Sequence, residues 1–257
     1  MDIIIKIIYR VKVYVYQKLF FNTNVFSINK KYYSEFLLSI KKLRKSNKST
    51  WNLFINEIYR SFLQDDKNSF LRFSIIQKTL HPPIFNTSKK YYEFLIKKKL
   101  FKEYLCKIAI ESPVGNPIMD PRFKLSSPTL IQHTYHLYKL IVDYGVDFKK
   151  IDVIFEFGAG YGSFVRLIKK MGYKKKYIIF DFPFMIALQK MYLKSVFATD
   201  NLSDNNILNN ILFYSNKNLK NVNVNSNLNN LFVATFSFSE TDLKLRKKFE
   251  GIIKNFK

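Results

Sequence analysis

The sequence has one cysteine, seven glycines and seven prolines in 257 residues. Cys106 has no second cysteine to pair with, which excludes an internal disulfide framework and favours a reducing compartment, the cytoplasm. Glycine and proline are too scarce for a collagen-like chain. Hydrophobic residues make up 47% and charged residues 24%, so the composition is that of a globular protein with one large or two small domains.

Acidic residues are also few, because 19 Asp and Glu stand against 43 Lys and Arg, a net charge of +24. Such a balance can indicate a polyanionic partner. Of the basic residues, however, 36 are Lys and only 7 are Arg, whereas nucleic-acid recognition relies on the planar Arg side chain. Lys, Asn, Ile, Phe and Tyr share AT-rich codons. We therefore attribute the charge mainly to mutational drift and expect no nucleic-acid partner.

Long apolar runs are absent as well, and a membrane-spanning helix needs about 20 such residues. Residues 1–21 are apolar, but basic residues interrupt them, and they lack the cleavage site of a signal peptide. Their apolar positions recur at helical spacing, which favours a helix packed on its own domain. A peripheral helix on an anionic membrane is the alternative, and the β-branched residues leave a strand open.

Helical periodicity dominates residues 1–125, which we expect to form a helical N-terminal region. The elements predicted in and just after this region are helices over 51–63, 89–110 and 128–144, a break at 81–83 and a loop over 111–127. Ser126 or Ser127 is expected to cap the last helix, and Gly145 to end it.

After Gly145 the pattern alternates between strands and helices, which is typical of a parallel sheet with crossover helices. Residues 126–257 are therefore predicted to form an α/β domain. The expected strands are 151–157, 177–180, 211–214 and 231–236, and the expected helices are 163–171, 184–193 and 243–256.

The stretch from Gly158 to Gly162 directly follows the first strand and is the most informative feature. Glycines between a strand and a helix let a ligand approach the backbone and aim helix N–H groups at it. The spacing is G-x-G-x-G, with Ser163 where the dinucleotide fingerprint has its third glycine, and no P-loop is present. Glu156 precedes the glycines, and Asp181 ends the second strand, 21 residues after Gly160.

This arrangement resembles motif I of class I S-adenosylmethionine-dependent methyltransferases. The resemblance implies a Rossmann-like core that binds S-adenosyl-L-methionine, with the glycine loop under the methionine part and Asp181 receiving the ribose hydroxyls. Glu156 would hold the loop or face the cationic end of the cofactor. A tight turn in another α/β fold is the alternative. The cofactor-binding residues so implied are Glu156, Gly158, Ala159, Gly160, Tyr161, Gly162, Asp181 and Phe182.

Four segments resemble the sugar O-methyltransferase family more closely, over about residues 110–245, and they are residues 127–137, 155–167, 178–193 and 231–241. The family's D-x-P element matches Asp181 and Pro183, and its L-Q-x-x-Y-L element matches residues 188–193. In that family a helical region precedes the core. The resemblance implies a small-molecule or glycan acceptor, with a sugar hydroxyl methylated in polysaccharide or glycan biosynthesis.

Three residues are candidates for the base that a sugar hydroxyl requires. His133 and His136 share one helix face, and Glu240 follows the fourth strand, where open α/β sheets bind ligands. The alternatives are structural histidines, a histidine pair that binds a metal, and a cap for the last helix at Glu240. We expect no metal.

A full class I core has seven strands, and only four can be placed before Lys257, so the methyltransferase domain is expected to be incomplete. A non-catalytic binding module is therefore one rival function. The other rival is a nucleic-acid methyltransferase, which the charge suggests. The [DNS]-P-P-[YFW] motif typical of base-amino methylation is absent, since Ser237-Phe238-Ser239-Glu240 occupies its place.

Overall fold

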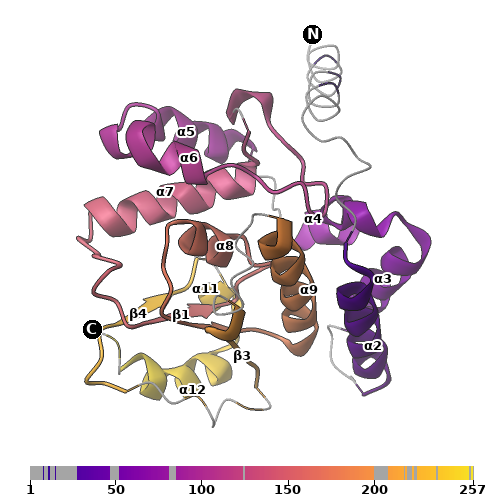
Figure 1. The fold of residues 1–257 in the computed structure, drawn as a ribbon. Coiled ribbons are helices and arrows are strands. Elements are labelled where there is room, and N and C mark those ends of the chain that lie inside the picture. Colours follow the sequence, from indigo (N-terminus) through magenta and orange to yellow (C-terminus); the bar gives the residue numbers. More distant parts are fainter. Residues whose placement is uncertain are drawn as a thin grey trace. The chain divides into compact units, whose positions relative to one another are not determined.

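The computed structural model describes residues 8, 11, 15, 28–46, 52–80, 85–123, 125–199, 208–216, 218, 222, 225–235, 237–254 and 256. They belong to two compact units, residues 1–139 and 140–257 (Figure 1). The helix expected over residues 1–21 lies outside the described residues except at Ile8, Val11 and Val15, and the break at 81–83 lies wholly outside them. No helix in the described part of the chain is long and apolar enough to cross a membrane.

Every regular element described in residues 1–139 is a helix. In chain order they are α2 (Lys30–Ser46), α3 (Asn52–Gln64), η1 (Lys67–Arg72), α4 (Ser74–Leu80), α5 (Phe85–Leu95), η2 (Phe101–Leu105), α6 (Cys106–Ile108), η3 (Pro121–Phe123) and α7 (Pro128–Val142), which continues into the second unit. The helix expected over 51–63 is α3. It buries Phe62 against Phe36, Phe70 and Phe73, with ring centroids 4.5 to 5.8 Å apart.

The single helix expected over 89–110 is wrong, because the chain turns between α5 and η2. Lys97 N and Lys98 N donate to the carbonyls of Phe94 and Leu95, three residues back, which closes α5 with tight turns. The spacing of the apolar residues suggested one helix. Leu95 and Leu105 are both buried, but they belong to separate elements. Periodicity alone does not detect such a turn, since the lysines suit a solvated helix equally well.

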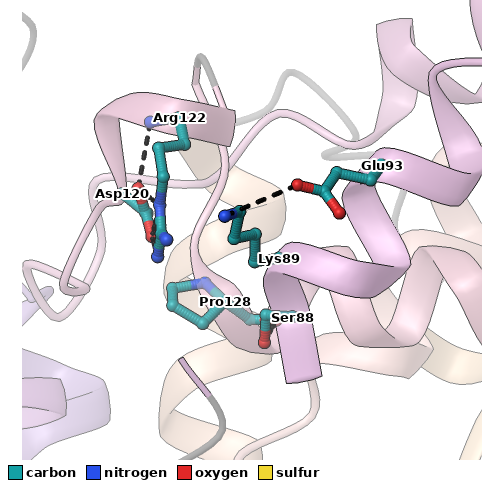
Figure 2. Close-up of polar contacts among 6 residues, drawn as sticks. All are labelled: Ser88, Lys89, Glu93, Asp120, Arg122 and Pro128. Carbon is teal, nitrogen blue, oxygen red and sulfur yellow. Dashed lines mark hydrogen bonds and ion pairs between the residues drawn. The ribbon is translucent and has the colours of Figure 1, made fainter. Parts of the chain in front are cut away.

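In the expected loop over 111–127, the described residues form the short helix η3 and otherwise irregular chain, and they are largely buried. Its buried carboxylate, Asp120, accepts hydrogen bonds from the backbone N–H and the Nε–H of Arg122, at 2.9 and 3.0 Å (Figure 2). Ser127 Oγ accepts a hydrogen bond from Leu130 N at 3.1 Å, so the predicted cap of α7 is confirmed at that serine. Figure 2 also shows Ser88 of α5 beside Pro128, the first residue of α7.

Residues 140–257 contain a four-stranded parallel sheet, so the α/β prediction is confirmed. Its elements are β1 (Val153–Phe157), α8 (Ser163–Lys170), β2 (Lys176–Phe180), α9 (Pro183–Thr199), β3 (Ile211–Tyr214), β4 (Asn230–Val233), α11 (Ser237–Glu240) and α12 (Leu243–Ile253). The strand order is β3-β2-β1-β4. Each of the four strands lies where hydrophobic pattern predicted it, with small differences at the ends.

Helices cover both faces of this sheet, with α12 on one side and α8 on the other (Figure 1). Phe249 of α12 is fully buried against Phe155, Phe157 and Phe180, with ring centroids 4.5 to 6.0 Å apart. The opposite face carries Ile154 and Glu156, because neighbouring side chains alternate along a strand. Burial on both faces explains why the strands are almost continuously apolar.

The strand order reverses between β1 and β4. From β1 the chain adds β2 and β3 on one side and then returns to place β4 on the other side of β1. The crevice at the carboxyl ends of the strands beside such a reversal is where open α/β sheets bind ligands. Gly158 follows β1 there, and Ser237 begins the short helix after β4.

Candidate cofactor site

The turn between β1 and α8 requires its glycines. Gly158, Gly160 and Gly162 have φ angles of +72°, +56° and +102°, a region that residues with a Cβ rarely adopt. Gly162 also forms the N-cap of α8. The predicted glycine turn between a strand and a helix is therefore present, with three left-handed residues within five positions.

Contacts hold the first glycine closely, whereas the second faces open space. Gly158 N donates to Phe180 O at 2.8 Å, and Ser237 Oγ donates to Gly158 O at 3.0 Å. A Cβ at Gly158 would collide with the side chain of Ser237. Apart from Gly160 itself and its two chain neighbours, no heavy atom of the described residues lies within 4 Å of the position that a Cβ of Gly160 would take. Of the three glycines in this turn, Gly160 is thus the one beside which the described residues leave space for a ligand.

Asp181 follows β2 and is half-buried beside this turn. Its Oδ1 accepts a hydrogen bond from Phe182 N at 2.8 Å, and its Oδ2 accepts one from Gln189 Nε2 at 2.7 Å. Burial raises the pKa of Asp181 to about 7, although hydrogen bonds from Phe182 N, Gln189 and Ala159 N oppose the rise. A carboxylate offers about four acceptor positions, so one remains for a ligand hydroxyl.

Glu156 lies on β1 and is buried. Its Oε2 accepts a hydrogen bond from the hydroxyl of Tyr177 on β2 at 2.7 Å. Burial, and to a smaller extent the nearby charge of Asp181, raises the pKa of Glu156 to about 8, while the bond from Tyr177 opposes the rise. At neutral pH Glu156 is therefore mostly uncharged. An uncharged carboxyl group suits a hydrogen bond between two strands better than the neutralisation of a cationic ligand.

The two aromatic residues expected at the site lie differently. Tyr161 is buried and meets Tyr192 edge to face, with ring centroids 5.0 Å apart. Its side chain belongs to the packing beneath the turn, so only its backbone would be available to a ligand. Phe182 is half-buried and stacks on Phe184, with ring centroids 5.8 Å apart.

The three candidate bases do not come together within either unit. His133 and His136 lie in α7 within residues 1–139, and Glu240 ends α11 in the other unit. Burial lowers the pKa of His136, whose ring lies 6.2 Å from that of Tyr91. The cap considered for Glu240 is supplied by Asp242, whose carboxylate accepts a hydrogen bond from Leu245 N at 2.7 Å.

Sequence reasoning missed Gln189 and Tyr177 as members of the site. Gln189 is fully buried in α9, and its Nε2 donates to both Gly160 O, at 2.8 Å, and Asp181 Oδ2. The L-Q-x-x-Y-L element, which matched residues 188–193, and the polar Gln189 within the mostly apolar stretch 184–193 were the signals available. Among the described residues, no group of three or more His, Cys, Asp or Glu could hold a metal ion.

Comparison with known proteins does not identify the class of protein to which this site belongs. No protein-family model, no curated protein and no solved structure matches the chain.

Proposed function

We propose that the chain is an S-adenosylmethionine-dependent O-methyltransferase, with a Rossmann-like domain over residues 126–257, whose sheet lies in the unit of residues 140–257. The observation that carries the proposal is the turn of three left-handed glycines at the carboxyl end of β1, beside the carboxylate of Asp181 at the end of β2. The turn lies where the strand order reverses, which is the usual ligand crevice of such sheets.

The residues present suit the cofactor. The open space at Gly160 allows close approach to the backbone, and the remaining acceptor position of Asp181 suits a hydroxyl of the ribose. When bound, the cofactor would supply the electrophilic methyl group, so the protein mainly holds and orients the two reactants. Glu156, uncharged at neutral pH, would support the strand that carries the turn.

The acceptor is proposed to be a sugar hydroxyl of a glycan or a nucleotide-linked sugar, on the sequence resemblance alone. His136 stays a proposed candidate for the base, and burial lowers its pKa, which favours an uncharged imidazole at neutral pH. His133 and Glu240 remain candidates for the same role. We propose a cytoplasmic location, with peripheral membrane contact through residues 1–21 as the alternative.

Isothermal titration calorimetry on the full chain tests the cofactor. The wild type should bind S-adenosylmethionine and S-adenosylhomocysteine, and Asp181→Ala should bind at least about tenfold more weakly, the effect of losing one charged hydrogen bond. Asp147→Ala is the matched control, since this exposed acid of the same unit accepts a hydrogen bond from Lys149 N and forms an ion pair with Lys150, both its near neighbours in sequence. A folded wild type that binds neither compound, or an Asp181→Ala variant that binds equally well, would contradict the proposal.

A transfer assay with labelled methyl donor separates the acceptor classes. Sugar nucleotides and oligosaccharides should accept the label, whereas RNA and DNA should not. Label on nucleic acid would favour the nucleic-acid methyltransferase, and cofactor binding without transfer to any acceptor would favour the non-catalytic module.

A further inference from the structure

A single buried side chain connects the two halves of the candidate cofactor site. Gln189 Nε2 lies 2.8 Å from Gly160 O in the glycine turn and 2.7 Å from Asp181 Oδ2 after the next strand. Gln189 lies in the second turn of α9, which begins two residues after Asp181. Side chains on a helix lean toward its N-terminus, so Gln189 reaches back to both.

The orientation of this amide follows from its neighbours. A carboxamide has two N–H donors on one nitrogen, and both neighbours, a backbone carbonyl and a carboxylate, are acceptors. The flipped amide would place its oxygen against two oxygens. In the observed orientation Gln189 Oε1 is buried and has no hydrogen-bond partner among the described residues. A buried oxygen without a hydrogen-bond partner costs free energy. Packing alone would therefore not favour a glutamine amide at this position.

We propose that Gln189 is the positioning residue of this site, whose amide connects the glycine turn to Asp181 and holds the Asp181 carboxylate ready for a ligand hydroxyl. The inference rests on the proposed function for the identity of the ligand, but the link between Gln189 and Asp181 can be measured without one. Because the amide donates to the charged carboxylate, it opposes the effect of burial and keeps part of the Asp181 population ionised near neutral pH. Among the described residues, Glu156 on β1 also lies near Asp181, and the hydroxyl of Tyr177 on β2 donates a hydrogen bond to it.

The first experiment follows the carboxyl signal of Asp181 by carbon-detected NMR during a pH titration of the full chain. Gln189→Met keeps the length of the side chain and removes both donors, so the Asp181 midpoint should rise by about one pH unit, a tenfold change in proton affinity. Ser195→Ala is the control in the same helix, since the buried Ser195 hydroxyl donates to Met191 O, a carbonyl of α9 itself. An unchanged midpoint in Gln189→Met overturns the proposal.

A measurement on the wild type guards against a variant that fails to fold. The side-chain amide signals of Gln189 should shift with the same midpoint as the Asp181 carboxyl, while those of Gln132, in the other unit, should not. If the Gln189 amide signals do not change over the pH range in which Asp181 titrates, the proposal is overturned.

Binding of S-adenosylhomocysteine then separates this inference from the proposed function. If the Asp181 midpoint rises from about 7 to about 8, the ionised fraction at pH 7 falls from about one half to about one tenth, so Gln189→Met should bind at least about fivefold more weakly. Equal affinity and an equal pH profile would overturn the positioning role. A folded wild type that does not bind, with the midpoint still moving as expected, would refute the proposed function and leave the positioning of Asp181 supported.

Discussion

Replacing Glu156 by Gln should change how the stability of the protein depends on pH. In the folded chain the pKa of Glu156 is raised from 4.5 to about 8, chiefly by burial. The folded state therefore holds a proton that the unfolded chain releases, and the wild type loses stability as the pH rises from about 4.5 to about 8. Each pH unit in this window costs up to about 1.4 kcal/mol, so the loss approaches about 5 kcal/mol above pH 8.

The Gln variant should not show this loss, because an amide has no proton to release. Its Oε1 can still accept the hydrogen bond from Tyr177, so near pH 4.5 the two proteins should have similar free energies of unfolding. Above pH 8 Glu156→Gln should be more stable by several kcal/mol, a large part of the 5–15 kcal/mol typical of a domain.

Urea unfolding of the wild type and Glu156→Gln, at intervals from pH 4.5 to pH 9, measures the difference. Glu57→Gln is the matched control, because Glu57 is exposed, and its curve should run parallel to that of the wild type. If the wild type and Glu156→Gln lose stability at the same rate over this range, Glu156 is ionised in the folded protein and the argument from burial is refuted.

Three further predictions concern the same unit. Gly158→Ala should reduce the free energy of unfolding by more than ~1–2 kcal/mol, the cost of a left-handed residue with a Cβ, because the new Cβ also collides with Ser237. Urea unfolding measures this change, and an unchanged stability would contradict the prediction. Asp242→Ala should lose about 1 kcal/mol with the N-cap of α12, and no loss by the same assay would mean that the cap contributes nothing. Burial lowers the pKa of Lys169 to about 8, so the wild type should gain stability relative to Lys169→Met as the pH rises from about 8 to 10.5; a constant difference in unfolding free energy would contradict it.

Most of the sheet and the glycine turn could be predicted because their signals are local. Each strand is a short apolar run, and the turn needs left-handed backbone that glycine supplies at low cost. The turn after α5 could not be predicted, because the lysines at 97–99 suit a solvated helix equally well and only the backbone hydrogen bonds of Lys97 and Lys98 reveal the turn. The hydrogen bond from Gln189 to Asp181 could not be predicted either, since it depends on how α9 packs beside the end of β2.

The sequence by itself therefore determined the order of strands and helices after Gly145, the place of the glycine turn and the acids on either side of it. These follow from hydrophobic period and from the backbone freedom of glycine, which act over a few residues. Only the tertiary structure decided that Gln189 hydrogen-bonds to both the glycine turn and Asp181, and that Tyr177 donates a hydrogen bond to Glu156. It also decided the protonation of both acids, because burial and hydrogen bonding depend on which strands and helices surround a carboxyl group.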